Sequence, residues 1–324
     1  MFARAGAKTK PDPELERWRS LLYWAAQTPH YWAQSGLMAD ASVLGSPSAL
    51  RARLRQFEPV SLKHFLANAK SFRSGYTRLL PTQEPWSFWD TPASIAVVHP
   101  WFCCAEPIRT FARQQHIGYT ARDVDQFEPD VLVASPAQLL RLSRYRIRRG
   151  PHRAIIAIQA PGMSPLSELE REWLWQRFHV PLYQQVRGFQ GELLAAECDA
   201  QVGLHVNAAA AHWEVRQQEL VFTSLLDLRH PVLRLSSGWH GDLETSRCGC
   251  GCLSARLFPY ELKSMVRTGR VELPRVTPLE PKSSASASSA TSARSAGLGA
   301  RVRRVHGAAR SIERQIRSRG EGGA

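Results

Sequence analysis

The sequence predicts an α/β fold: a mainly parallel sheet flanked by helices, with an antiparallel β appendage. Short β-branched runs alternate with segments of helical periodicity through the middle of the chain, which is typical of βαβ units. From Leu193 onward, short strands separated by turns replace this alternation and indicate antiparallel pairing. With 324 residues, 44% of them hydrophobic, the chain can bury a large core.

The N-terminal region is predicted to consist of short helices. Residues 13–27 carry apolar side chains at helical spacing, and Pro13 favours the first turn of a helix. Residues 47–57 predict a second, strongly basic helix, and Ser61 is suited to cap a third. Residues 71–92 are rich in Trp, Pro and Ser without periodicity, so a loop with short strands is expected there.

The middle of the chain alternates short apolar runs with amphipathic segments. Buried strands are predicted at residues 95–98, 130–134 and 154–158, and helices at residues 106–116, 137–142 and 166–178. Further short strands are expected at residues 212–215, 219–223 and 232–235. This order predicts that the first strands pair in parallel across helical connections.

Changes in composition divide the chain into four predicted parts. They are an N-terminal helical segment (residues 1–70), an α/β core (71–192), a β-rich subdomain with a Cys/His cluster (193–280) and a disordered basic tail (281–324). The tail has nine Lys or Arg and two Asp or Glu, so it carries +7 of the net charge of +14. An apolar stripe in the tail predicts either a basic amphipathic helix that contacts an anionic surface or a partner, or a solvated tail. The stripe consists of Val305, Ala309, Ile312 and Ile316.

The sequence contains no predicted transmembrane segment. No apolar run approaches the roughly 18 residues of a membrane span, and no apolar segment follows the basic residues 1–10. Six cysteines in a chain of this length are too few for a disulfide scaffold. A cytoplasmic location is therefore expected.

Four of the cysteines lie in one stretch that also holds a histidine. Cys198 is followed by His205 and, about forty residues later, by a Cys-x-Cys-Gly knuckle at Cys248 and Cys250. Three thiolates and one imidazole suit tetrahedral zinc, and a closed set of four ligands is typical of a structural site. Cys252 competes with Cys250 for the last position. The alternative is that these residues are ordinary reduced cysteines and a core histidine.

Several motifs occur in the order found in a known family. They are Leu-Leu-x-x-Ala-x-x-Thr-Pro-His-Tyr at residues 21–31, Pro-Val-Ser-Leu-Lys at 59–63, the strand and turn at 128–136, and the series Glu-Cys, Gly-Leu-His and Cys-x-Cys-Gly between residues 197 and 251. Over most of residues 15–262 the chain resembles the phenylacetate-CoA ligase-like branch of the adenylate-forming (AMP-binding) enzymes. The resemblance implies a truncated adenylate-forming N-terminal domain with zinc at Cys198, His205, Cys248 and Cys250.

Enzymes of this family activate an acid as its adenylate and pass it to a thiol, usually that of coenzyme A. The resemblance therefore implies ATP with magnesium, and coenzyme A, as ligands if activity is retained. The only candidate for the phosphate loop is the turn at Ser74, Gly75 and Thr77, which lacks a second glycine. Its alternative is an ordinary turn. The Lys-bearing lobe that such enzymes carry has no counterpart in the sequence beyond Leu262.

The acidic residues of the nucleotide site are displaced or replaced in this comparison. Gly188 stands at the position of the magnesium-binding glutamate, and Glu192 is the weak catalytic candidate for that role, with a surface carboxylate as the alternative. Trp239 stands where the ribose-binding aspartate is expected, and an indole cannot accept hydrogen bonds from two hydroxyl groups. Asp242 would substitute for it only if the loop moved.

These observations favour a degenerate member of the family, a pseudoenzyme with lost or impaired adenylation that binds a small carboxylic acid or a protein partner. One alternative is a divergent active acid-CoA or amide-forming ligase that uses substitute residues. Another is a basic nucleic-acid-binding protein, suggested by the tail and by a run of arginines between two predicted elements. The run comprises Arg141, Arg144, Arg146, Arg148 and Arg149.

Overall fold

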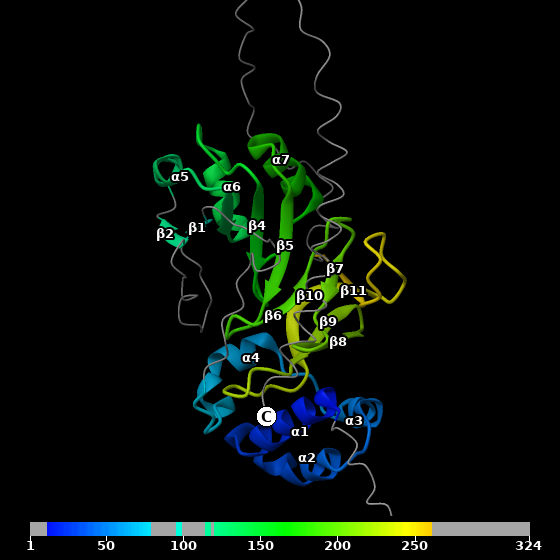
Figure 1. The fold of residues 1–324 in the computed structure, drawn as a ribbon. Coiled ribbons are helices and arrows are strands. Elements are labelled where there is room, and N and C mark those ends of the chain that lie inside the picture. Colours follow the sequence, from blue (N-terminus) through cyan, green and yellow to red (C-terminus); the bar gives the residue numbers. More distant parts are fainter. Residues whose placement is uncertain (1–11, 79–94, 99–113, 118–119, 261–324) are drawn as a thin grey trace, which may run out of the picture. The chain divides into compact units, whose positions relative to one another are not determined.

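The computed structural model describes residues 12–78, 95–98, 114–117 and 120–260 (Figure 1). The chain divides into two units, Met1–Tyr260 and Glu261–Ala324, and the second unit lies outside the described residues. The predicted basic tail and its amphipathic helix therefore lie outside them as well. The predicted boundaries at residues 71, 193 and 281 stay predictions.

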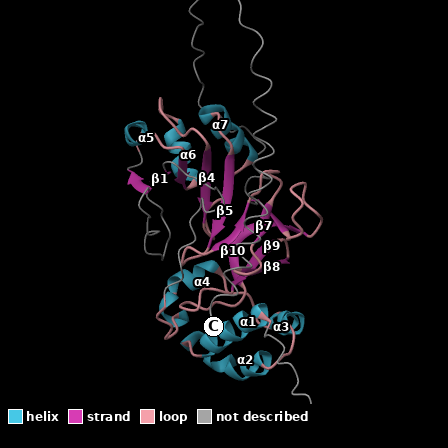
Figure 2. Ribbon diagram, viewed as in Figure 1, coloured by secondary structure: helices cyan, strands magenta, loops and turns pink. Residues whose placement is uncertain are grey.

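The centre of the fold is one mixed sheet (Figure 2), which contains 11 strands in the described part of the chain. The strands are β1 (Ile95–Val98), β2 (Gln114–Ile117), β3 (Val131–Ala134), β4 (Ala154–Gln159), β5 (Leu182–Arg187), β6 (Leu193–Ala196), β7 (Leu204–Val206), β8 (Ala211–Arg216), β9 (Glu219–Ser224), β10 (Leu235–Glu244) and β11 (Arg256–Tyr260). Their order across the sheet is β2-β1-β3-β4-β5-β6-β7-β11-β10-β9-β8. The strands from β2 to β5 pair in parallel, and every later pairing is antiparallel. The predicted fold class is confirmed.

The parallel half is built on fully buried strands and capped helices. All residues of β3 and β4 are buried. Helix α5 (Ala121–Phe127) precedes β3, and α6 (Pro136–Ser143) and α7 (Glu168–Phe178) follow β3 and β4. Ser135 and Ser167 begin α6 and α7 with capping boxes, in which the serine and the third helical residue satisfy each other's backbone N–H. Leucines of both helices pack with β3 and β4 in one hydrophobic core.

The N-terminal helices pack with the antiparallel half of the sheet in a second core. They are α1 (Pro13–Ala26), η1 (Pro29–Gln34), α2 (Ser35–Ser42), α3 (Pro47–Leu54), α4 (Leu62–Ala67) and η2 (Ala69–Phe72). The chain between α3 and α4 is tied to the sheet at Val60, which donates to the Arg234 carbonyl (2.9 Å) and accepts from the Ser236 N–H (2.9 Å). The Arg234 side chain donates to the backbone carbonyls of Arg55 and Phe57, which strengthens this junction.

Two predicted elements were wrong. The helix expected at residues 106–116 is contradicted at residues 114–116, which belong to β2, and the rest of that helix lies outside the described residues. Parallel pairing with β1 outweighs the local helical propensity there. The strand expected at residues 232–235 also differs. Residues 232–234 are buried but precede β10, which begins at Leu235 and extends to Glu244.

Most of the residues expected to form a loop with short strands also lie outside the description. Residues 71–78 contain the end of η2 and a turn but no strand, and residues 79–92 are not described. No helix in the described residues is long and apolar enough to cross a membrane.

Candidate metal centre

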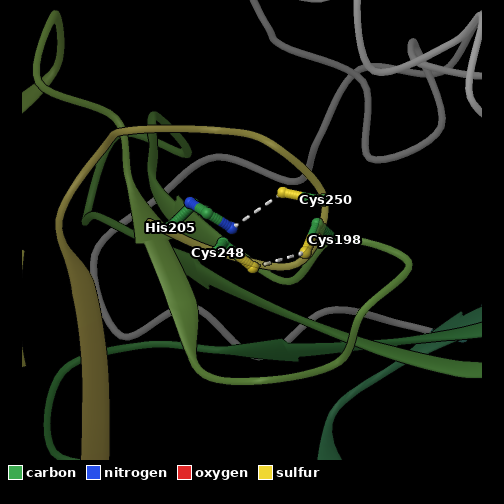
Figure 3. Close-up of side chains that lie close together, drawn as sticks. All are labelled: Cys198, His205, Cys248 and Cys250. Carbon is green, nitrogen blue, oxygen red and sulfur yellow. Dashed lines mark hydrogen bonds between the residues drawn. The ribbon is translucent and has the colours of Figure 1, made fainter. Parts of the chain in front are cut away.

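The side chains of Cys198, His205, Cys248 and Cys250 converge (Figure 3). Their ligand atoms all lie within 4.8 Å of one another. The sulfur atoms of Cys198 and Cys248 are 3.7 Å apart, and the Cys250 sulfur is 3.4 Å from Nε2 of His205. Tetrahedral zinc, with bonds of about 2.3 Å to sulfur and about 2.0 Å to nitrogen, would separate two sulfurs by about 3.8 Å and a sulfur and a nitrogen by about 3.5 Å. The two measured separations match this geometry.

Three neighbouring segments of the sheet supply the four side chains. Cys198 follows β6, His205 lies in β7, and Cys248 and Cys250 lie in the connection between β10 and β11. A glycine is required beside β7, because Gly203 has φ +72° and a Cβ there would lie 2.8 Å from the ring of Phe258 in β11. The absence of a side chain at Gly203 therefore lets the segment before β7 lie close to β11.

Backbone N–H groups surround the sulfur atoms. Cys198 accepts a hydrogen bond from the N–H of Ala200, Cys248 accepts one from the N–H of Cys250, and Cys250 accepts one from the N–H of Cys252. In each case the donor lies two residues after the acceptor. Hydrogen bonds to sulfur favour the thiolate over the thiol, which is the form that binds a metal.

Without a cation, burial opposes the ionisation of all three thiols. Burial raises the pKa of Cys198 to about 12, and burial also raises the pKa of Cys250. Burial acts in the same sense on Cys248, but the Cys250 N–H and the neighbouring thiols outweigh it and lower the Cys248 pKa. A divalent cation would supply the missing positive charge, and its binding would release protons.

The histidine is oriented by a serine in the Cys-rich connection. Nδ1 of His205 lies 2.9 Å from the Ser254 hydroxyl oxygen. When Nδ1 carries the proton and donates to Ser254, Nε2 presents its lone pair to the sulfur atoms. Burial and the charge of Arg256 lower the pKa of His205, so the neutral imidazole is favoured.

The structure distinguishes between the two candidates for the fourth ligand. Cys250 belongs to the converging set, whereas Cys252 is exposed and its sulfur lies 3.1 Å from the Ser254 hydroxyl. The set provides four protein ligands, as a closed structural zinc site requires.

The predicted phosphate turn is engaged with another loop of the protein. The Ser74 hydroxyl donates to the Leu228 carbonyl and accepts from the Tyr76 N–H, while the Ser74 N–H donates to the Arg229 carbonyl (2.9 Å). Gly75 and Thr77 beside it are exposed. The turn therefore attaches the chain after η2 to the connection between β9 and β10.

Glu192 is not a surface carboxylate, because it is only 4% exposed. One carboxylate oxygen accepts from the Ser224 hydroxyl (2.8 Å) and the other from the Gln190 N–H (3.0 Å). The carboxylate occupies the space that a side chain at Gly188 would fill. Burial raises the pKa of Glu192, and burial together with the nearby Glu192 raises the pKa of Asp227 well above its ordinary value.

Two buried charged residues near Glu192, Arg187 and Asp227, were not predicted from the sequence. Arg187 donates to the carbonyl of Gly191 (2.8 Å) and to the side chain of Gln185 (3.1 Å). Asp227 accepts from the backbone N–H of His230 (2.9 Å). One signal is present in β5, where Gln184 and Gln185 are consecutive. A strand with one face in water would instead alternate polar and apolar residues.

Trp239 and Asp242 lie in β10. Trp239 is 1% exposed, and its indole N–H donates to the Met163 carbonyl, so the side chain fills the space between β10 and the segment after β4. Asp242 is exposed and lies within the strand, where it pairs with Phe258 of β11. The loop movement that would let Asp242 replace the ribose aspartate is therefore unavailable without opening a strand pair.

No family model matches the chain, and no curated protein matches it. Among solved structures, 2-hydroxyisobutyryl-CoA ligase in an open conformation with 2-HIB-AMP and CoA matches with a TM-score of 0.53 and 13% identity, over 75% of this chain and 67% of the ligase. The same ligase in the postadenylation state with R3-HIB-AMP matches with a TM-score of 0.54 and 12% identity, over 80% of this chain and 72% of the ligase. Similarity at this level of identity concerns the fold alone. The chain thus shares the fold of a part of this CoA ligase.

Proposed function

We propose that this protein is a degenerate relative of the adenylate-forming ligases, in which a structural zinc ion maintains the fold and ATP-dependent acid adenylation is lost or impaired. The observation that carries the proposal is that side chains at the expected nucleotide-binding positions are engaged inside the protein. Ser74 bonds to a neighbouring loop, Glu192 is enclosed, and Trp239 packs against the segment after β4.

Each of these features bears on a different part of the nucleotide. A phosphate loop needs free N–H and hydroxyl donors, whereas Ser74 directs both its N–H and its hydroxyl to backbone carbonyls. A magnesium ligand needs an accessible carboxylate, whereas both oxygens of Glu192 already accept hydrogen bonds.

The ribose contact is affected in the same way. The buried indole of Trp239 has one N–H donor, and that donor is bonded to Met163. Removing a single electrostatic contributor to an active site typically lowers the rate by about 10²–10³-fold. Changes at several positions together would leave little adenylation.

Zinc would act here by joining segments of the sheet. Cys198, His205, Cys248 and Cys250 would hold it as a closed set, so the ion would contribute to folding free energy. The N–H groups of Ala200, Cys250 and Cys252 would stabilise the bound thiolates. We infer that the small carboxylic acid or protein partner expected from the sequence would be bound without being activated.

Metal analysis and nucleotide binding test the two parts of the proposal separately. Purified protein is expected to contain one zinc ion per chain, and a Cys198→Ser/Cys248→Ser variant is expected to lose it. ATP with magnesium is expected neither to raise the melting temperature nor to support acid-dependent pyrophosphate exchange. Pyrophosphate exchange above the background of a no-enzyme control would refute the loss of adenylation and would indicate a divergent active ligase.

A further inference from the structure

The Cys/His set lies where the sheet is held together by its shortest pairings. β6 pairs with β7, and β7 with β11, through two residue pairs each in the described chain. The pairs are Ala195–Val206, Ala196–His205, Arg256–His205 and Leu257–Leu204. Cys198 follows β6 on one side of this seam, and Cys248 and Cys250 precede β11 on the other. A bound ion would therefore connect the segment after β6 to β7 and to the segment before β11.

The segment that carries Cys198 is attached along β5 by several hydrogen bonds. The Glu197 N–H donates to the Gln184 carbonyl (2.9 Å), the Tyr183 hydroxyl to Asp199 (3.1 Å), and the Gln201 side chain to the Leu182 carbonyl (2.8 Å). These bonds fix the position of the Cys198 backbone relative to the parallel half.

Glu197 is the charged residue at the centre of this attachment, and its side chain is 3% exposed. One carboxylate oxygen accepts from the Gln184 N–H (2.7 Å), and the other accepts from the Gln184 side chain (3.2 Å) and forms an ion pair with Arg171 of α7. The Gln184 side chain also accepts from Gln159 of β4 (2.8 Å). A buried polar network thus runs from β4 and α7 to the residue next to Cys198.

We propose that Glu197 is the positioning residue of the metal centre, which holds Cys198 at ligand distance by anchoring it to Gln184 and Arg171. The inference rests on the proposed zinc site. Removing the carboxylate would leave the Gln184 N–H and the Arg171 guanidinium without their buried acceptor, so the loop would shift. The Cys198 sulfur would then have to be returned to ligand distance whenever a metal binds, which would weaken metal binding.

Cobalt(II) titration tests this role, because tetrahedral cobalt bound by thiolates absorbs visible light and reports both affinity and geometry. Glu197→Ala is expected to weaken cobalt binding by roughly 10–100-fold, the usual effect of losing a residue that orients a metal ligand, and to change the visible spectrum. Glu197→Gln keeps an oxygen acceptor for the Gln184 N–H, so it is expected to restore most of the affinity and the spectrum.

Glu214→Ala is the matched control. Glu214 of β8 forms another well-buried ion pair, with Arg234, and belongs to a different part of the sheet. It is expected to lower the melting temperature while leaving cobalt affinity and spectrum unchanged.

The outcomes separate this inference from the zinc proposal. If the wild-type chain binds neither zinc nor cobalt, both fail. If it binds cobalt but Glu197→Ala binds equally well with the same spectrum, or Glu214→Ala loses as much affinity, only the role of Glu197 fails. Should Glu197→Ala not fold, Arg171→Ala takes its place, because it removes the ion pair that anchors Glu197. Weaker cobalt binding is then expected, and cobalt binding by Arg171→Ala with wild-type affinity and spectrum overturns the role.

Discussion

Replacing Gly188 by alanine tests the position of Glu192, on which the proposed loss of activity depends. A Cβ at residue 188 would overlap Oε1 and Cδ of Glu192 and lie 2.6 Å from Oε2. The carboxylate cannot withdraw freely, because the Ser224 hydroxyl and the Gln190 N–H hold its two oxygens. Displacing it would break two hydrogen bonds to a buried acid, each worth about 1.5–3 kcal/mol when the acid is charged. We therefore expect Gly188→Ala to lower the free energy of unfolding by about 3–6 kcal/mol.

Urea denaturation measures this loss, and two further variants identify its cause. Gly45→Ala is the control, since nothing lies within 4 Å of a Cβ at that position, and its effect should stay within about 0.5 kcal/mol. In a Glu192→Ala background, Gly188→Ala has no carboxylate to displace and should cost at least about 2 kcal/mol less than in the wild type. If Gly188→Ala costs under about 1 kcal/mol in the wild type, Glu192 is free to move toward a nucleotide, and the argument for lost activity fails.

Three other predictions concern the metal, a buried acid and the predicted phosphate turn. Removing zinc with a chelator should lower the melting temperature of the wild type but not of Cys198→Ser/Cys248→Ser; an equal response by calorimetry would contradict a structural metal at this set. Folding raises the pKa of Asp227, so protonation of Asp227 favours the folded state, and the free energy of unfolding should decrease as pH rises above the ordinary pKa of 3.8. Asp227→Asn should reduce this decrease, as measured by urea denaturation at several pH values. An unchanged slope would contradict the burial of an ionisable Asp227. Ser74→Ala should lower the free energy of unfolding by about 1–2 kcal/mol through the lost hydrogen bond to Leu228, with no effect on ATP binding by calorimetry; weaker ATP binding would restore Ser74 as a phosphate ligand.

The sequence was informative wherever local patterns coincide with the final environment. Residues 131–134 and 154–158 are apolar and rich in β-branched side chains, and they lie in buried strands close to the predicted bounds. Ser61 and Pro13 mark helix starts because caps depend on neighbouring residues only. The spacing of Cys198, His205 and the Cys-x-Cys knuckle likewise predicted a set that the structure brings together.

Tertiary structure decided what depends on distant partners. Strand β5 contains Gln184, Gln185 and Arg187, which read as polar, yet all three are buried. The Glu197 carboxylate, from beyond β6, accepts a hydrogen bond from the Gln184 N–H, and the Gly191 carbonyl accepts one from the Arg187 guanidinium. These distant partners make the burial of both residues possible.

The choice between Cys250 and Cys252 depended on the path of the backbone, because both cysteines have similar spacing to the other ligands. Only the folded turn directs Cys250 toward His205 and leaves Cys252 exposed. In the same way, the resemblance predicted Trp239 at the position of an acid, whereas the burial of Trp239 against Met163 followed from the packing of β10 beside the segment after β4. Composition and spacing thus determined the fold class and predicted the Cys/His set that converges, whereas long-range hydrogen bonds, which no local pattern encodes, determined which polar residues are enclosed.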